Sequence, residues 1–300
     1  MPEETPKVIV NKYGFYEVEN KPSAEDLSNY YEEKYYQQSK GSYQKKYTIE
    51  EEAFFISRLQ RKYETLNRLL IEKFSGQDMR FLDVGAGEGW ALQFFKSKGF
   101  NVTGIDYSSA GMELQNPELI SELIVGDIYE QLNLMIDRNL PFDIIQLDNV
   151  LEHVLDPYQL IMDVSGLLNS KESVLIIEVP NDFSILQRKL IEKGEIDKKY
   201  WLTYPDHLSY FNKSGLENLL KDCGFDLEEL STDFPIDFAL LNPETNYTKE
   251  KSKGHNVHLQ RVAIENLLAE ISISKTNKIY SNFAEMGIGR NIIGYFKLEK

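Results

Sequence analysis

Apolar residues recur along this chain in two alternating patterns. Between residues 49 and 74 they follow helical spacing, with Phe54, Leu59, Leu66 and Leu70 on one side. Five short apolar runs then come at 80–85, 100–108, 121–128, 142–150 and 173–181, and helical stretches such as 90–99 and 158–168 separate most of them. Strands that alternate with helices predict an α/β fold, with a mostly parallel sheet and helices on both faces.

The alternation changes after Asn181. Residues 181–211 form a longer, aromatic-rich segment, and 214–224 reads as a helix with Ser214 as its cap and Gly224 as its stop. A sixth strand is predicted at 226–234, a helix over residues 257–273, and a last strand at 289–298. Because no linker divides this part, we expect one domain over 49–300 with insertions at about 181–211 and 242–290. The tyrosine-rich segment 1–48 is predicted to be an ordered cap or lid.

Composition narrows the choice of partners. The 300 residues carry a formal net charge of −15, which argues against duplex nucleic acid or an anionic membrane surface as a partner. With the single cysteine Cys223, an internal disulfide and a thiolate zinc site are both excluded. The acidic start lacks a signal-peptide core, and no uncharged apolar stretch reaches the length of a membrane span. We therefore expect a cytoplasmic protein without an integral membrane segment.

Three glycines follow the first apolar run, in the stretch LDVGAGEGW. A strand, then Gly85, Gly87 and Gly89, then a helix is typical of a nucleotide-binding turn, because glycines let the backbone turn tightly and approach a ligand closely. The pyrophosphate-binding pattern has its third glycine one residue later, so a ligand without pyrophosphate is favoured. Asp106 ends the second strand, where an acid can accept hydrogen bonds from both ribose hydroxyls. Asp127 ends the third strand, where it could bind an exocyclic amine.

These pieces together resemble the S-adenosylmethionine-dependent methyltransferases with a Rossmann-like seven-stranded sheet. The stretches LDVGAGEGW, GIDYS, GDI, FDIIQLDNVLEHVLDP and SVLIIEVPN occur in the family's order, and DHLSYFNKSGLENLLKDCGF is similar to its later part. The resemblance implies strand order 3-2-1-4-5-7-6 with the last strand antiparallel, and S-adenosyl-L-methionine as cofactor. It implies cofactor contacts from Asp83, Gly85, Ala86, Gly87, Gly89, Trp90, Asp106, Tyr107, Asp127, Ile128, Asp148 and Asn149.

Two histidines are candidates for acid–base chemistry. His207 is the first candidate, and His153 is its rival. Both come after strands, on the side of the sheet where the family places its acceptor, and imidazole can accept a proton near neutral pH. In the similar ubiquinone-pathway O-methyltransferases, the stretch matching NVLEH carries ligands for a divalent metal. Here Asn149 stands where that pattern has a carboxylate, so we expect no bound metal. Tyr204, Tyr210 and Tyr36 are candidate acceptor contacts, although aromatic residues also serve as simple packing.

The resemblance extends weakly to the acceptor. The tyrosine-rich start, HLSYF and GRNIIGYF look like methyltransferases of bacterial sugar and surface-polysaccharide pathways. We therefore expect an O-methyltransferase of a sugar, nucleotide-sugar or surface glycan. Two alternatives stay open, namely methylation of a quinone precursor or natural product, and a cofactor-binding protein without catalysis. Nucleic-acid methylation is disfavoured by the charge and because DNVLEH is unlike a base-flipping motif.

Overall fold

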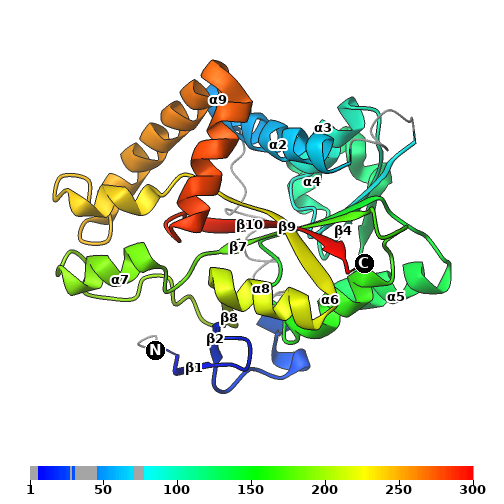
Figure 1. The fold of residues 1–300 in the computed structure, drawn as a ribbon, viewed down its shortest axis with the longest axis horizontal. Coiled ribbons are helices and arrows are strands. Elements are labelled where there is room, and N and C mark those ends of the chain that lie inside the picture. Colours follow the sequence, from blue (N-terminus) through cyan, green and yellow to red (C-terminus); the bar gives the residue numbers. More distant parts are fainter. Residues whose placement is uncertain (1–5, 28, 31–45, 71–77, 300) are drawn as a thin grey trace.

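A seven-stranded sheet forms the centre of the computed structural model, which describes residues 6–27, 29–30, 46–70 and 78–299. The strand order is β5-β4-β3-β6-β7-β10-β9 (Figure 1), and the first five of these strands are parallel while β10 runs antiparallel to both of its neighbours. The predicted order and the antiparallel last strand are confirmed. The strands are β3 (Arg80–Val84), β4 (Asn101–Asp106), β5 (Leu123–Val125), β6 (Ile144–Asp148), β7 (Val174–Pro180), β9 (Phe225–Thr232) and β10 (Asn291–Leu298).

Helices cover both faces of this sheet. In Figure 1, α2, α3, α4 and α9 lie above it, and α5, α6 and α8 lie below it. Among the described helices, none is both long enough and apolar enough to cross a bilayer. The helices are α2 (Ile49–Leu69), α3 (Trp90–Ser97), α4 (Ala110–Gln115), α5 (Ile128–Asp137), α6 (Pro157–Ser165), α7 (Ile185–Glu192), α8 (Lys213–Asp222) and α9 (Gly254–Glu285), with 3-10 turns η1 (Pro117–Glu122), η2 (Ile236–Leu241) and η3 (Lys251–Lys253).

The central strands are apolar on both sides because both sides are covered. Every residue of β7 is buried, as expected for a strand inside a sheet with helices on each face. Even-numbered residues such as Ile176 pack toward α2 and α3, and odd-numbered ones such as Ile177 pack toward α5, α6 and α8. The two cores hold the carboxyl ends of β3, β4, β6 and β7 at one edge of the sheet, where α/β folds bind ligands.

A small second sheet joins the N-terminal segment to the first insertion. Strands β1 (Val8–Val10) and β2 (Tyr16–Val18) pair with each other, and β2 pairs with β8 (Ser209–Tyr210). Its side chains share a third core with Trp201 and Leu240. Sequence reasoning did not predict this sheet, because its strands are only two or three residues long.

Two predicted helix boundaries are wrong. Asn212, not Ser214, caps α8, since its side-chain oxygen accepts a hydrogen bond from Gly215 N at 2.9 Å. The helix predicted over 257–273 is only the first arm of α9, which continues to Glu285 beyond a non-helical residue, Ser272. The Ser272 hydroxyl accepts from Lys275 N at 3.3 Å and so starts the second arm as a cap would.

Candidate active site

A cavity of about 200 Å³ lies at the carboxyl ends of β3 and β6, beneath α2. Its floor is the glycine turn between β3 and α3, and its roof is one face of α2. Residues from both sources therefore surround any ligand bound there. The lining residues are Phe55, Arg58, Leu59, Lys62, Asp83, Gly85, Ala86, Glu88, Gly89, Trp90, Ala91, Gln146 and Asp148.

The glycine turn has a backbone that side chains would obstruct. Gly85 has φ of +82°, and a Cβ atom there would lie 2.5 Å from Cγ2 of Val150. Gly87 also has positive φ, at +53°, and its N–H donates to Oδ2 of Asp106 at 2.8 Å. The bare backbone thus leaves room for a ligand while Asp106 fixes the shape of the turn.

The Asp106 carboxylate is held in place by backbone donors. Its second oxygen, Oδ1, accepts from Ser108 N at 3.0 Å, and only 7% of the residue is exposed. Burial raises the pKa of Asp106, while the N–H groups of Ser108 and Gly87 oppose that rise. Each carboxylate oxygen has capacity for a further hydrogen bond, so the group can receive ligand hydroxyls at the end of β4.

Three charged residues that line the cavity, Arg58, Lys62 and Asp148, form a network with the buried Glu178 behind them. The Lys62 ammonium lies 2.9 Å from Oδ2 of Asp148 and 2.8 Å from Oε2 of Glu178, and Arg58 pairs with Oε1 of Glu178. Burial opposes ionisation, but Arg58 and Lys62 hold the pKa of Glu178 below its usual value. Burial and the nearby Glu178 raise the pKa of Asp148. The cavity therefore presents both cations and carboxylates at one end.

Asp83 adds a carboxyl group of intermediate acidity. Burial, and then the charge of Asp148, raise the pKa of Asp83 to about 7. Gln146 Nε2 donates to Oδ1 of Asp83 at 3.3 Å. An ammonium group placed beside Asp83 would favour its ionised form, so this side of the cavity suits a cationic group.

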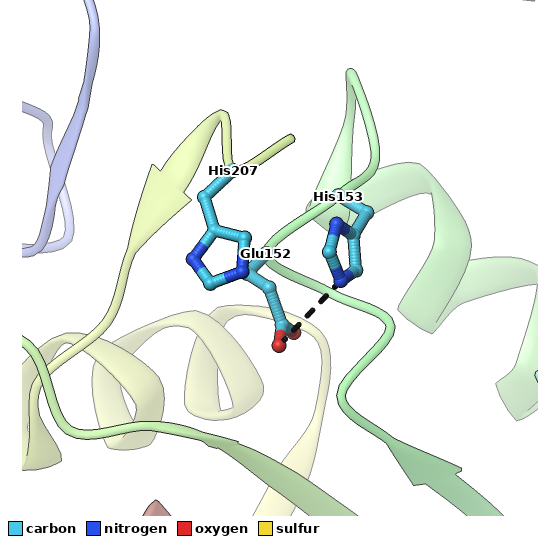
Figure 2. A group of neighbouring side chains, drawn as sticks. All are labelled: Glu152, His153 and His207. Atoms are coloured by element: carbon cyan, nitrogen blue, oxygen red, sulfur yellow. Dashed lines mark ion pairs between the residues drawn. The ribbon is translucent and has the colours of Figure 1, made fainter. Parts of the chain in front are cut away.

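A second cluster, of Glu152, His153 and His207, lies beyond the end of β6. Figure 2 shows the Glu152 carboxylate facing the His153 ring, at 3.9 Å from Oε1 to Nε2, with the His207 ring beside them. The two rings have centroids 4.9 Å apart. Burial raises the pKa of Glu152 well above its usual value, and among the described residues its Oε2 has no hydrogen-bond partner.

The tautomer of His153 follows from a backbone contact. His153 Nδ1 lies 2.7 Å from the carbonyl oxygen of Asp206, and a carbonyl can only accept. Nδ1 of the neutral ring must therefore carry the hydrogen, which leaves a lone pair on Nε2 toward Glu152. His153 can thus accept a proton or bind a cation at Nε2.

Comparisons with known proteins agree with this geometry. A family model described as a methyltransferase domain matches residues 55–230. The chain belongs to this methyltransferase family. The methyltransferase is also 24% identical over 165 residues to a ubiquinone biosynthesis O-methyltransferase of Coxiella burnetii, covering 52% of this chain and 70% of that protein.

The chain is also similar to solved methyltransferase structures. The plantazolicin methyltransferase BamL, solved with a triazolic desmethylPZN analog and SAH, is 15% identical and has a TM-score of 0.50, covering 93% of this chain and 92% of that one. A SAM-dependent methyltransferase from Archaeoglobus fulgidus is 21% identical with a TM-score of 0.47, and the match covers 80% of this chain and 94% of that one. The family recognised in the sequence is confirmed: the protein is an S-adenosylmethionine-dependent methyltransferase with the Rossmann-like fold.

The residues present fit S-adenosylmethionine. Its methionine end carries an ammonium and a carboxylate, and the cavity offers Asp83 and Asp148 for the first and Arg58, whose buried Nε has no hydrogen-bond partner among the described residues, for the second. The turn at Gly85 leaves its backbone bare, and Asp106 holds a fixed carboxylate at the end of β4, the position that the family resemblance assigns to ribose binding. The cofactor supplies a methyl group activated by its attachment to a sulfonium.

The predicted cofactor residues fall into two groups. Those that line the cavity are Asp83, Gly85, Ala86, Gly89, Trp90 and Asp148, and Gly87 and Asp106 adjoin it through their hydrogen bond. The other four do not line the cavity: Asp127 caps α5 and accepts from the hydroxyl of Tyr107, Ile128 is buried in the core, and the Asn149 amide donates to Oδ1 of Asp148 at 2.8 Å.

The predicted acceptor residues and the cysteine have different surroundings. Tyr204 is 39% exposed, and Tyr210 is buried with its hydroxyl donating to the His207 carbonyl at 3.0 Å, so Tyr210 packs rather than faces solvent. Tyr36 lies outside the described residues. Cys223 is buried in the core, and burial raises the pKa of its thiol to about 12, which fits a packing role.

Sequence reasoning missed the contribution of α2. Phe55, Arg58, Leu59 and Lys62 all line the cavity, yet the helix was interpreted only as an apolar stripe. Arg58 and Lys62 are four residues apart and hence on one face, and Lys62 falls between apolar positions of the buried side. A cation repeated on the apolar face of a helix is the signal that could have identified them.

Proposed function

We propose that this methyltransferase methylates a hydroxyl group of a sugar, nucleotide-sugar or surface glycan, with the histidine pair accepting the hydroxyl proton. The observation that carries the proposal is the pairing of His153 with His207 beyond the end of β6, with Nε2 of His153 left as an acceptor. In the reaction the acceptor oxygen bonds to the methyl carbon, the carbon–sulfur bond breaks, and the proton passes to imidazole. His207 was the first choice from sequence, but the Asp206 carbonyl contact favours His153.

The roles of the other residues follow from their positions. Arg58, Lys62, Asp83 and Asp106 hold and orient the cofactor, and most of the rate increase comes from this positioning because sulfonium is already a good leaving group. The sugar assignment is supported by the resemblance of the chain to sugar-pathway methyltransferases and by the exposed ring of Tyr204, a suitable platform for a sugar face. The match to a ubiquinone biosynthesis O-methyltransferase supports a quinone precursor as the alternative acceptor.

A divalent cation at the histidine cluster is a second version of the same reaction. Glu152, His153 and His207 can each offer one donor atom, all within 4.8 Å of one another. With donors about 2.0–2.2 Å from the ion, adjacent donors of a tetrahedral site lie roughly 3.4 Å apart, whereas Glu152 Oε1 and His153 Nε2 are 3.9 Å apart. Asn149, the position of the missing carboxylate, bonds to Asp148 instead. We therefore keep the metal-free version as the proposal.

Conversion of S-adenosylmethionine to S-adenosylhomocysteine, measured with a panel of nucleotide-sugars, glycans and phenols, tests the proposal. His153→Ala should lower turnover by roughly 10²–10⁴-fold while the Kd for S-adenosylhomocysteine stays unchanged. His207→Ala provides the comparison, and activity should persist after exhaustive EDTA treatment. If both variants keep more than about a tenth of the turnover, base catalysis is wrong. Loss with EDTA that Mg²⁺ reverses would establish the cation version.

A further inference from the structure

A second cavity, of about 290 Å³, lies apart from the cofactor site. It opens between the segment that follows β9 and the first arm of α9. On the helix it is bordered by Val257, Gln260, Arg261 and Ile264, which follow helical spacing and so form one face. The opposite wall consists of Phe234, Ile236, Phe238, Ala239, Asn242 and Thr245.

The charge at the inner end of this cavity is already balanced. Arg261 Nη2 lies 2.8 Å from Oδ2 of Asp233, and its Nε lies 2.9 Å from Oε1 of Glu265. Arg61 shares Glu265 at 3.4 Å, so two cations and two carboxylates meet there. An anionic ligand would find no uncompensated cation, and none of the lining residues is acidic, so a cationic ligand would find no partner either.

One buried aromatic ring lies between an arginine of this cavity and an arginine of the cofactor cavity. The Arg261 guanidinium lies 5.2 Å from the Phe54 ring centroid, and Arg58, which lines the cofactor cavity, lies 5.7 Å from the same ring. Phe54 is buried. Phe54 itself lines neither cavity, and the second cavity has neither the glycine turn nor the acid that a nucleoside would need.

We infer that this second cavity is a binding site for a small, uncharged, mainly apolar ring compound or hydrocarbon chain. Six of its ten lining side chains are apolar, and amide and hydroxyl groups at Asn242, Thr245 and Gln260 provide a few polar contacts, the usual composition of a small-molecule site. Its volume is nearly twice the roughly 150 Å³ that holds a benzene ring, which is enough for two fused rings. Such binding does not depend on the proposed methyl transfer.

Fluorescence of N-phenyl-1-naphthylamine, an uncharged probe, tests this site in the full chain. We expect saturable binding that Ala239→Trp weakens by about tenfold or more, because the added ring occupies the cavity. Gln260→Trp at the exposed rim is a second filling variant, in case the first disturbs folding. Leu267→Trp, an exposed position of α9 outside the cavity, is the matched control and should bind the probe as wild type does.

Competition identifies the class of ligand. 2-Naphthol should displace the probe, and 2-naphthalenesulfonate should not, since Arg261 is already paired. If the sulfonate displaced the probe as well as 2-naphthol does, the inference of an uncharged ligand would be wrong. If the filled variants bound the probe as tightly as wild type, the inference that the probe binds in this cavity would be wrong. A dimer in sedimentation that Ala239→Trp dissociates would show that a second copy covers the cavity instead. The Kd for S-adenosylhomocysteine should be unchanged in every variant, which separates this result from the fate of the methyltransferase proposal.

Discussion

Replacing Gly85 by alanine should separate two costs that the glycine turn avoids. The first is the left-handed backbone, at φ +82°, which costs an L-residue about 1–2 kcal/mol. The second is the contact of the new Cβ with Cγ2 of Val150 at 2.5 Å, which we expect to cost about 1–3 kcal/mol as the core shifts. Gly85→Ala should therefore lower the free energy of unfolding by roughly 2–5 kcal/mol and weaken S-adenosylhomocysteine binding.

Gly99 supplies the control for the backbone term. Its φ is +89° and nothing lies within 4 Å of the place of its Cβ, so Gly99→Ala should cost only the first amount and leave cofactor binding intact. Urea unfolding followed by circular dichroism, with calorimetry for S-adenosylhomocysteine, measures both effects. In a double-mutant cycle, the interaction energy between Gly85→Ala and Val150→Ala should be about 1–3 kcal/mol, because removal of Cγ2 of Val150 relieves the contact with the new Cβ. Equal destabilisation by Gly85→Ala and Gly99→Ala, with no coupling to Val150, would refute the steric reasoning.

Three further predictions concern the charges of the cavity. Lys62→Met should lower the free energy of unfolding by about 3–5 kcal/mol, because it leaves Asp148 without its cation and Glu178 with Arg58 alone. Lys96→Met, which removes an exposed pair with Glu122, should cost about 1 kcal/mol or less in the same urea titration. Folding raises the pKa of Asp83 from 3.8 to about 7, so the folded chain keeps a proton that the unfolded chain releases between these values. The free energy of unfolding of wild type relative to Asp83→Asn should consequently fall as pH rises from about 4 to about 7, by up to about 1.4 kcal/mol per pH unit. If the two proteins showed the same dependence of this free energy on pH, the raised pKa of Asp83 would be refuted. Asp106→Ala should weaken S-adenosylhomocysteine binding in calorimetry and, by freeing two backbone N–H groups, should also destabilise the fold by about 1–3 kcal/mol; an unchanged Kd would show that this carboxylate does not reach the ribose.

The parts of the fold that sequence could predict are those encoded locally. The five parallel strands and β10 are short, mostly apolar runs, and β3 and β4 lead directly into the residues of the site, so Gly85 and Asp106 could be identified from their neighbours in sequence. Their strand order came from the resemblance to a family, and the structure has the same order. The small sheet escaped notice because its strands are too short to show a period.

The rest of the site depends on contacts between distant parts of the chain. Lys62 meets Asp148 across 86 residues, and no local pattern indicates that pairing. His153 and His207 were recognised separately, but their rings meet only because the first insertion returns to the end of β6, where Leu208 N donates to the Glu152 carbonyl at 2.8 Å. Prediction of such contacts requires the path of the insertions, which composition and periodicity do not determine.

The position of β10 has a consequence for synthesis of the chain on the ribosome. This strand contains residues 291–298, yet it lies between β7 and β9 and bonds to both. Until it leaves the exit tunnel, β7 has an open edge and β9 has no neighbour in the sheet, and open edges invite pairing with other chains. Asn291 also donates to Oε1 of Glu178 at 2.8 Å, so the charge network beside the cofactor cavity is completed only after β10 joins the sheet. A nascent chain should thus need protection from aggregation until residues 291–298 have left the ribosome, and a chain stalled before residue 291 should lack a finished cofactor site.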